Sequence, residues 1–481
     1  MKEECTRKSN CELPALNQID KSKPIHFVGI GGAGMSAIAK VLIEMGFKVE
    51  GSDLKESNYI RLLRNAGASI AIGHREENIS NPSLLVVSSA IPHDNPEVRL
   101  AKARGIPVIS RALMLGTIVS TKVGIAVAGT HGKTTTASMI ANIMIDCGVD
   151  PSFLIGGELN EIGGNARFGN GDFLVAEADE SDGSLLLLKP FAVVLTNIDS
   201  DHMDYFGNIE KVEAIFSDFL HLIPSEGFAI VCGDDFRARS VAIRYSESGG
   251  NVFTYGKNGE NDYYFKEVNL SPDGTTFSAF FKGKKIGNVR LSVCGMHNVY
   301  NALAALSTAH RFGFDIRNVI ESLGKFSGVR RRFEFVGQAK DVCVFDDYAH
   351  HPTEIKAVID TARLSSQGRL IVVFQPHRFT RTRLLAEQFG DCFDGADVLV
   401  LTEIYGAGEE PEPGVTSKLI LDSIKKRNRT LPVHYIPNRS SLASKVVKLC
   451  SKGDTVITMG AGDITQCSRE ILDLLKDDLV V

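Results

Sequence analysis

The sequence predicts an α/β protein with mainly parallel, doubly wound sheets divided among about three domains. Two observations support this fold class. The chain has 481 residues, which is too long for one hydrophobic core when a domain averages roughly 150 residues. Short β-branched runs also alternate with helix-like segments along most of the chain, which is the pattern that builds parallel sheets.

The expected strands follow in chain order. Each is a short apolar run that is followed by a polar or glycine-containing loop: residues 25–30, 47–52, 84–89, 106–110, 123–129, 172–178, 191–197, 228–233, 342–348, 369–376, 397–403 and 455–462. Residues 245–295 break the alternation, because they read as antiparallel strands joined by Gly and Asn turns. We therefore expect a small antiparallel insertion in the middle of the chain.

The strand pattern sets the expected domain limits. Residues 1–23 mix charges of both signs without an apolar core, and we expect a disordered extension there. New strands open after residue 120 and after the basic cluster that ends at Arg332. The predicted domains are therefore 24–120, 121–332 and 333–481.

Composition excludes several classes of function. The net charge is −5, which gives no electrostatic footprint for nucleic acid. No apolar run approaches the roughly 18 residues that a spanning helix needs, so we expect no membrane insertion. The nine cysteines lack C-x-x-C spacing and indicate free thiols in a reducing, cytoplasmic compartment.

The first glycine-rich loop lies in FVGIGGAGMSAIA, residues 27–39. Gly29, Gly31 and Gly34 have the G-x-G-x-x-G spacing of a dinucleotide-binding turn, and Asp53 ends the next apolar run. Such a loop lets the backbone approach a pyrophosphate at a helix N-terminus. The loop alone does not distinguish NAD from a UDP-sugar.

The second loop, AVAGTHGKTTT at residues 126–136, is the strongest motif. Its backbone N–H groups would cradle phosphates, Lys133 would neutralise phosphate oxygens, and the Thr134 hydroxyl would reach Mg²⁺. Val127 stands where a standard Walker A sequence has Gly. We expect ATP and Mg²⁺ as the ligands of this loop.

Metal-compatible side chains follow two later strands. The segment DFLVAEADESD contains Glu177, with Asp179, Glu180 and Asp182 as secondary candidates. The segment TNIDSDHMD contains His202, flanked by Asp201 and Asp204. Ligands of α/β proteins bind at the carboxyl ends of such strands. Carboxylates and a histidine at neighbouring strand ends therefore predict a Mg²⁺ site beside the phosphate loop.

Taken together, these motifs resemble the Mur ligases, which build the peptide of bacterial peptidoglycan. The segments GTHGKTTT, EADESD, TNIDSDHMD, GMHNVYNALAA and RRRFEF occur in that family's order. The resemblance runs from about residue 24 to the carboxyl terminus. It implies a Rossmann-like N-terminal domain, a central P-loop ATPase-type domain and a Rossmann-like C-terminal domain.

The resemblance also implies the reaction. DDYAHHPTEI, FQPHRFTRT and EIYGAGEEPEPG are similar to segments of the family members that join L-alanine to UDP-N-acetylmuramate with ATP, through an acyl phosphate. Lys133, Glu177, His202, Arg332 and Asp347 would be catalytic, and the metal ligands would be Thr134, Glu177 and His202. The implied partners are these small molecules, with the protein a monomer or weak homodimer.

The remaining implied contacts divide by ligand. The ATP set is Gly129, Thr130, His131, Gly132, Lys133, Thr134, Thr135, Asn298, Asn301, Arg332 and Asp347. The UDP-sugar set is Gly29, Gly31, Gly32, Gly34, Ser52, Asp53, His74, Ser88 and Ser89. The set for the amino acid and the substrate anions is Tyr348, His350, Arg378 and Arg381.

Three alternatives stay open. A related ligase would add a recycled tripeptide to the same UDP-sugar. An NAD-dependent oxidoreductase would use the first loop and leave the second loop unexplained. A non-catalytic P-loop switch would bind ATP without forming an amide. Arg331 and Asp346 are the alternatives to Arg332 and Asp347 if the matching is out of register by one residue.

Overall fold

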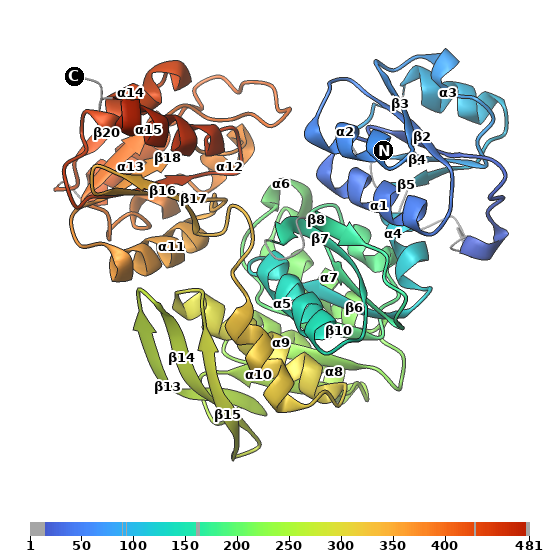
Figure 1. The fold of residues 1–481 in the computed structure, drawn as a ribbon, viewed down its shortest axis with the longest axis horizontal. Coiled ribbons are helices and arrows are strands. Elements are labelled where there is room, and N and C mark those ends of the chain that lie inside the picture. The colour runs from blue at the N-terminus through green and yellow to red at the C-terminus, as the bar shows by residue number, and fades with distance from the viewer. Residues whose placement is uncertain (1–14, 89, 93, 160–163, 428–429, 478–481) are drawn as a thin grey trace.

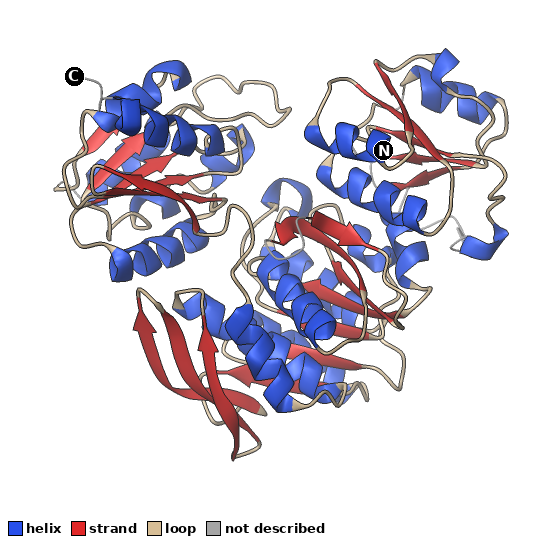
Figure 2. Ribbon diagram, viewed as in Figure 1, coloured by secondary structure: helices blue, strands red, loops and turns tan. Residues whose placement is uncertain are grey.

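The chain folds around three separate sheets, as a computed structural model describes it for residues 15–88, 90–92, 94–159, 164–427 and 430–477. In Figure 1 the N-terminal part (blue) and the C-terminal part (orange to red) lie on the same side of the central part (green). Helices lie on both sides of the parallel strands of each sheet, while a group of antiparallel strands projects from the central part at the lower left, as Figure 2 shows. The described helices include none that is long and apolar enough to cross a membrane.

The first sheet has five parallel strands in the order β3-β2-β1-β4-β5. Its elements are β1 (Ile25–Val28), α1 (Ala33–Glu44), β2 (Val49–Asp53), α2 (Asn58–Asn65), β3 (Ser69–Ile72), β4 (Leu84–Val87), α3 (Pro96–Ala103), β5 (Val108–Ser110) and α4 (Arg111–Val119). The strand order reverses at β1, so the loop after β1 lies where open α/β sheets bind their ligands.

The central sheet has ten strands in the order β15-β14-β13-β12-β11-β10-β6-β9-β7-β8. Its elements are β6 (Val123–Ala128), α5 (Lys133–Asp146), β7 (Ser152–Leu159), β8 (Gly164–Arg167), β9 (Phe173–Glu177), β10 (Ala192–Leu195), α6 (Met203–Phe206), α7 (Ile209–Leu220), β11 (Phe228–Cys232), α8 (Phe236–Glu247), β12 (Val252–Gly256), β13 (Tyr263–Ser271), β14 (Gly274–Phe281), β15 (Lys284–Leu291), α9 (Met296–Arg311) and α10 (Ile316–Lys325). Because β6 pairs with β9 and β10, the ends of these three strands meet around the loop after β6.

The antiparallel insertion is present and smaller than predicted. Strands β13, β14 and β15 form an antiparallel meander that extends one edge of the central sheet. The expectation that all of residues 245–295 is antiparallel was wrong at its start, because β12 pairs in parallel with both β11 and β13. Residue 245 itself belongs to α8.

The third sheet has six strands in the order β16-β17-β21-β18-β19-β20, parallel except for β16. Its elements are β16 (Glu334–Ala339), β17 (Val342–Asp347), α11 (Pro352–Ser365), β18 (Leu370–Phe374), α12 (Phe379–Leu384), β19 (Val398–Leu401), α13 (Lys418–Arg427), β20 (Val433–Tyr435), α14 (Leu442–Val447), β21 (Thr455–Met459) and α15 (Thr465–Asp477). The domain limits at 120/121 and 332/333 stay predictions, as does the disorder expected for residues 1–23, most of which lie outside the described residues.

The N-terminal and central parts are packed together through α1. Lys40 on α1 donates from Nζ to the carbonyl of Ala166 on β8 at 2.7 Å. One continuous apolar core runs from Phe27 on β1 through Ile118 on α4 to Ala126 on β6. This packing brings the N-terminal end of α1 towards the phosphate loop after β6.

Candidate active site

The loop after β6 has the geometry of a phosphate cradle. Gly129 and Gly132 both have left-handed backbones, with φ of +122° and +81°. A Cβ on Gly129 would lie 2.2 Å from Thr196 Oγ1, and one on Gly132 would lie 2.6 Å from Asn301 Oδ1. The loop therefore requires glycine at both positions, and its amides lead directly into α5, whose N-terminus favours anions.

Lys133 is the first residue of α5 and lies among carboxylates. Its Nζ is 2.9 and 3.0 Å from the two carboxylate oxygens of Glu180 and donates to the carbonyl of Thr130 at 3.1 Å. Burial lowers the pKa of Lys133, but Glu180, Asp179 and Glu177 outweigh burial, so its pKa is raised. Lys133 is thus a cation at the start of α5 that is paired with Glu180.

The predicted metal ligands converge beside Lys133. The Thr134 hydroxyl donates to Glu177 at 3.0 Å, and Glu177 also accepts from the amide of Gly156 at 2.7 Å. His202 has a left-handed backbone (φ +56°), and burial lowers its pKa, which favours the neutral, ligating imidazole. Thr134, Glu177, Asp179 and His202 line one cavity of about 870 Å³. Oxygen donors of this kind fit Mg²⁺.

A second cavity, of about 530 Å³, lies on the other side of the phosphate loop. Asn298 and Asn301 line it from α9, with Arg332 and Asp347 on the facing side. The two asparagines are 8% and 7% exposed, and Asn301 Nδ2 donates to Asn298 Oδ1 at 3.3 Å. Thr135 also lines this cavity, as do His131 and Gly132.

Two adjacent Arg–Asp pairs have different surroundings. Arg331 is bonded to the carbonyl of Gly460 at 2.6 Å and to Asp346 at 3.4 Å, inside the C-terminal part. Arg332 and Asp347 instead line the second cavity. Burial raises the pKa of Asp347 to about 6, with Arg332 opposing this effect. The geometry favours Arg332 and Asp347 over their neighbours as the ligand-facing pair.

The first glycine-rich loop is closed by a carboxylate. Asp53 accepts from the Gly31 amide at 2.8 Å, and Ser52 Oγ is 2.8 Å from His74 Nδ1. The other candidates of this loop are Gly29, Gly32, Gly34 and Ser88, at or next to the carboxyl ends of β1 and β4. Ser89 lies outside the described residues. Ser52 also donates to the buried Glu97 at 2.6 Å.

The predicted anion-binding arginines reach the central domain. Arg381 is 3.0 and 3.1 Å from the two carboxylate oxygens of Asp201, and Arg378 is 3.2 Å from Asp204. Tyr348 and His350 line the same 870 Å³ cavity as these arginines. Burial lowers the pKa of His350 to about 4. The cavity thus receives side chains from α1 and α4, the phosphate loop and the C-terminal part.

Comparison with protein families matches three successive models to this chain. They are the "Mur ligase family, catalytic domain" over residues 24–123, the "Mur ligase middle domain" over 127–309 and the "Mur ligase, glutamate ligase domain" over 331–462. The chain belongs to the Mur ligase family.

Relatives within the Mur ligases are similar over nearly the whole chain. The UDP-N-acetylmuramate–L-alanine ligases of Geobacter sp. strain M21 and of Rubrobacter xylanophilus are 46% and 47% identical, over 95% and 93% of this chain and 98% and 99% of theirs. The crystal structure of UDP-N-acetylmuramate–alanine ligase from Thermotoga maritima covers 95% of this chain and 100% of its own, with 29% identity and a TM-score of 0.79.

These relatives confirm the predictions of a Mur ligase, of its three-domain α/β architecture and of an ATP-dependent, amide-forming enzyme. The dehydrogenase alternative loses its support, because the first loop belongs to a Mur ligase domain. The roles of individual site residues stay predictions.

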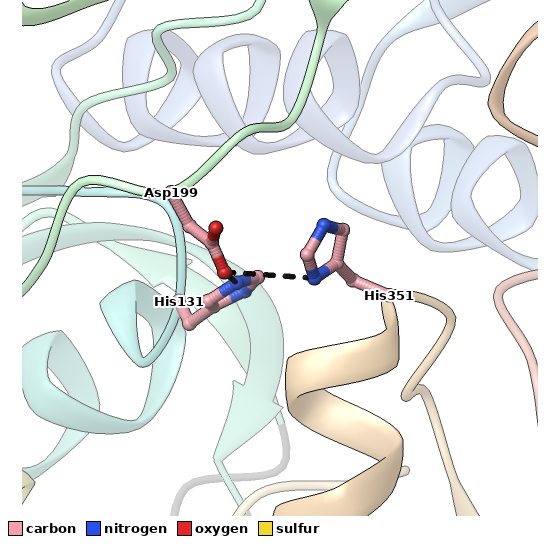
Figure 3. A group of neighbouring side chains, drawn as sticks. All are labelled: His131, Asp199 and His351. Carbon is pink, nitrogen blue, oxygen red and sulfur yellow. Dashed lines mark hydrogen bonds and ion pairs between the residues drawn. The ribbon is translucent and has the colours of Figure 1, made fainter. Parts of the chain in front are cut away.

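The sequence predicts His131 as part of the ATP loop but does not reveal its partners Asp199 and Glu354. His131 lies between Asp199 of the central domain and Glu354 of α11, while His351 lies beside Asp199 (Figure 3). Glu354 follows a histidine pair and a proline at a helix start, and its position as the third residue of a capping box was a readable signal. Asp199 had no such signal, because a loop aspartate is ordinarily solvated, and Asp201 was expected beside the metal site rather than as the partner of Arg381.

Proposed function

We propose that this Mur ligase joins L-alanine to the lactyl carboxylate of UDP-N-acetylmuramate and cleaves ATP to ADP and phosphate. The observation that carries this proposal is the 870 Å³ cavity, which Lys133, Glu177 and His202 share with Tyr348, Arg378 and Arg381. A ligase needs its phosphoryl-transfer groups and its amine pocket at one place. The names of the relatives support alanine as the amine.

ATP fits across the two cavities that meet at the phosphate loop. Its adenosine would occupy the 530 Å³ cavity, near Asn298, Asn301 and the buried carboxylate of Asp347. Its phosphates would lie on the amides of Gly132 and the first turn of α5, within reach of Lys133. Binding there would draw Lys133 away from Glu180 towards the γ-phosphate.

Magnesium fits the donor set beside the phosphates. Thr134 and Glu177 would hold one ion and His202 a second, and bound Mg²⁺ would neutralise charge on the phosphate oxygens. The chain prepares this site by hydrogen-bonding Thr134 to Glu177 and Glu177 to the Gly156 amide. These bonds fix the direction of the carboxylate before any ion binds.

The nucleophiles of the reaction belong to the substrates, so the protein acts by holding the substrates in position. The muramate carboxylate attacks the γ-phosphorus, the bond from that phosphorus to the ADP oxygen breaks, and an acyl phosphate forms. The alanine nitrogen attacks the acyl carbon, the amine gives up a proton, and phosphate leaves. Lys133 balances charge in the first step, and Arg378 and Arg381 hold carboxylate groups near Tyr348 and His350. We also infer a cytoplasmic location in a bacterium and a monomer or weak homodimer.

Phosphate release from ATP tests this proposal. Purified protein with Mg²⁺ and UDP-N-acetylmuramate is assayed with each amino acid in turn, and then with a muropeptide tripeptide. We expect release and amide product with L-alanine, lost in Lys133→Ala. Release with the tripeptide alone would make the chain a recycling ligase. Binding of NAD without any ATP turnover would overturn the ligase function.

A further inference from the structure

One side chain of the phosphate loop reaches the C-terminal domain. His131 Nδ1 is 3.1 Å from Glu354 Oε1 on α11, and His131 Nε2 is 3.1 Å from Asp199 Oδ2 after β10. Figure 3 shows His131 and His351 both beside the Asp199 carboxylate, with their ring centroids 4.8 Å apart. His131 is two residues before Lys133, so a movement of the phosphate loop would directly change the distances from His131 to Glu354 and Asp199.

The contact is ionic. Burial lowers the pKa of His131, but hydrogen bonds and charge from Asp199 and Glu354 outweigh burial and raise its pKa to about 9. Hydrogen bonds from His131 and Thr353, with the charge of His351, hold the pKa of Asp199 well below its ordinary value despite burial. Hydrogen bonds between charged groups are about twice as strong as neutral ones. The bridge is therefore a firm link between two domains.

Glu354 carries the link onward to the amino-acid segment. Its other oxygen, Oε2, accepts from the amide of His350 at 3.1 Å and from the amide of His351 at 3.4 Å. The His351 side chain and Glu354 together form the capping box of α11. One carboxylate thus joins the phosphate loop to the backbone that places Tyr348 and His350 in the cavity.

A metal ion is a weaker explanation of this cluster. One ligand atom each from His131, Asp199 and His351 lies within 4.8 Å of the others, which is the kind of grouping that Zn²⁺ could use. However, both ring nitrogens of His131 already face carboxylates, and His351 Nδ1 accepts from the Thr353 amide at 3.3 Å. His351 Nε2 is buried without a hydrogen-bond partner among the described residues and could accept a metal, but a metal on either ring nitrogen of His131 would displace a hydrogen bond to a carboxylate.

We propose that His131 is a positioning residue that couples the phosphate loop to the amino-acid-binding segment through Glu354. With nucleotide in the cradle, the loop holds His131 in place, and Glu354 then fixes the His350 amide in the arrangement that accepts alanine. The inference rests on the proposed function. It adds a residue pair, His131 and Glu354, through which ATP binding at the phosphate loop would arrange the segment that binds alanine.

The test is a double-mutant cycle on the full-length enzyme. The variants are His131→Ala, Glu354→Gln and the double variant, and Thr353→Val is the matched control. That control removes a different bond between the same two domains, from Thr353 Oγ1 to Asp199 at 2.7 Å. For each variant we would measure KM for alanine, KM for ATP, kcat, and the ratio of phosphate released to amide formed.

We expect both single variants to raise KM for alanine about 10-fold or more, the usual effect of losing a charged hydrogen bond. KM for ATP should rise less than about 3-fold in Glu354→Gln; in His131→Ala, which also removes a side chain of the predicted ATP set, it should rise less than KM for alanine. The acyl phosphate should also be lost to water more often, so phosphate should exceed amide. KM for alanine in the double variant should be no higher than in the more impaired single variant, because both substitutions remove the same interaction. Thr353→Val should change the ratio of phosphate released to amide formed only slightly.

Three results would overturn the proposal: strictly additive effects, an equal rise in KM for ATP, or a 1:1 ratio of phosphate to amide in every variant. Tight Zn²⁺ binding to the wild type that is lost in His351→Ala would replace it with a metal site. Thermal unfolding of each variant separates these outcomes from misfolding, and absence of amide in the wild type would count against the proposed function instead.

Discussion

The two glycine-rich loops of this chain, after β1 and after β6, have the same connectivity. Each joins a buried parallel strand to a helix whose N-cap is glycine, Gly32 or Gly132. In the first loop a carboxylate, Asp53, accepts from the loop amide of Gly31. In the second a cation, Lys133, opens the helix and is matched by Glu180. In the proposed function both turns hold phosphate, and the side chains around each turn decide whether phosphate is only held or also transferred.

A histidine between two carboxylates accompanies each loop. His26, on β1, is 3.0 Å from Glu50 and 3.0 Å from Glu97, which both belong to the same domain. His131, inside the second loop, has one carboxylate from each of two domains. The same chemical pattern therefore stabilises one domain in the first case and links two domains in the second.

The largest effect should come from removing the cation that distinguishes the second loop. Lys133→Ala is expected to lower kcat at least about 10³-fold, because a charge placed against the transferring phosphoryl group is lost. Binding of UDP-N-acetylmuramate, measured by calorimetry, should be unchanged, because it depends on the first loop. A variant with near-normal kcat would show that the two loops do not differ in this way.

The next effect should come from the metal-compatible carboxylate. Glu177→Gln keeps the shape and loses the charge, and we expect kcat to fall about 10²-fold or more, with partial recovery at high Mg²⁺. Asp182→Asn, on the same acidic segment, is the matched control. Equal losses in the two variants would indicate a general effect of the acidic segment rather than a ligand at Glu177.

Matched glycine substitutions compare the two turns themselves. Ala at position 132 would need φ near +81° and would put Cβ 2.6 Å from Asn301 Oδ1. We expect Gly132→Ala to lower kcat about 10- to 100-fold and to lower the unfolding temperature, because the strained turn must shift. At Gly32 the nearest atom to a Cβ is 3.8 Å away. Gly32→Ala should therefore leave the unfolding temperature unchanged and affect only KM for the UDP-sugar.

The turns and the strands that carry them could be predicted from the sequence, because both are local features. All twelve predicted strands have a counterpart in the structure. Strands β3, β7, β8, β16 and β20 were missed, since SIAI, SFLIGGEL, GNAR, EFVGQA and VHY are short or contain glycine and take their form from neighbouring strands. The parallel pairing of β12 was likewise set by β11, beyond the local pattern.

The site was predictable where a residue type has one plausible use, as for Lys133 in GTHGKTTT. It was not predictable where the partner lies far along the chain. Glu354 is 223 residues from His131, and Asp201 is 180 residues from Arg381. Glu97 is wholly buried and accepts from His26 and Ser52, yet the sequence shows only a glutamate in the first turn of a helix.

The smallest effect on rate, with a clear effect on stability, is expected at His26. His26→Asn would remove the one cation among the hydrogen-bond partners that the described residues give the buried carboxylate of Glu97. The carboxylate would keep only Ser52, Asn78 and a backbone amide of these partners, and breaking such a pair costs about 3 kcal/mol. The unfolding transition of the N-terminal domain is the one expected to shift when UDP-N-acetylmuramate is added. In His26→Asn this transition should move to lower temperature, while kcat changes less than about 3-fold. His434→Asn, at an exposed position on β20, is the matched control.

The pH dependence of that unfolding transition tests whether His26 is charged in the folded protein. Burial lowers the pKa of His26, but Glu50 and Glu97 outweigh it and raise the pKa above 6.5. The resulting stability is present in full below pH 6.5 and is lost as pH rises through the raised pKa. Burial raises the pKa of Glu97, but its hydrogen bonds outweigh burial and lower it below 4.5, so its contribution is present above pH 4.5 and lost as pH falls. The unfolding temperature of the wild type should therefore be highest between these two pH limits, and that of His26→Asn should change less with pH. If the unfolding temperatures of both proteins follow pH in parallel, His26 is held uncharged. Its likeness to His131 would then be only geometric.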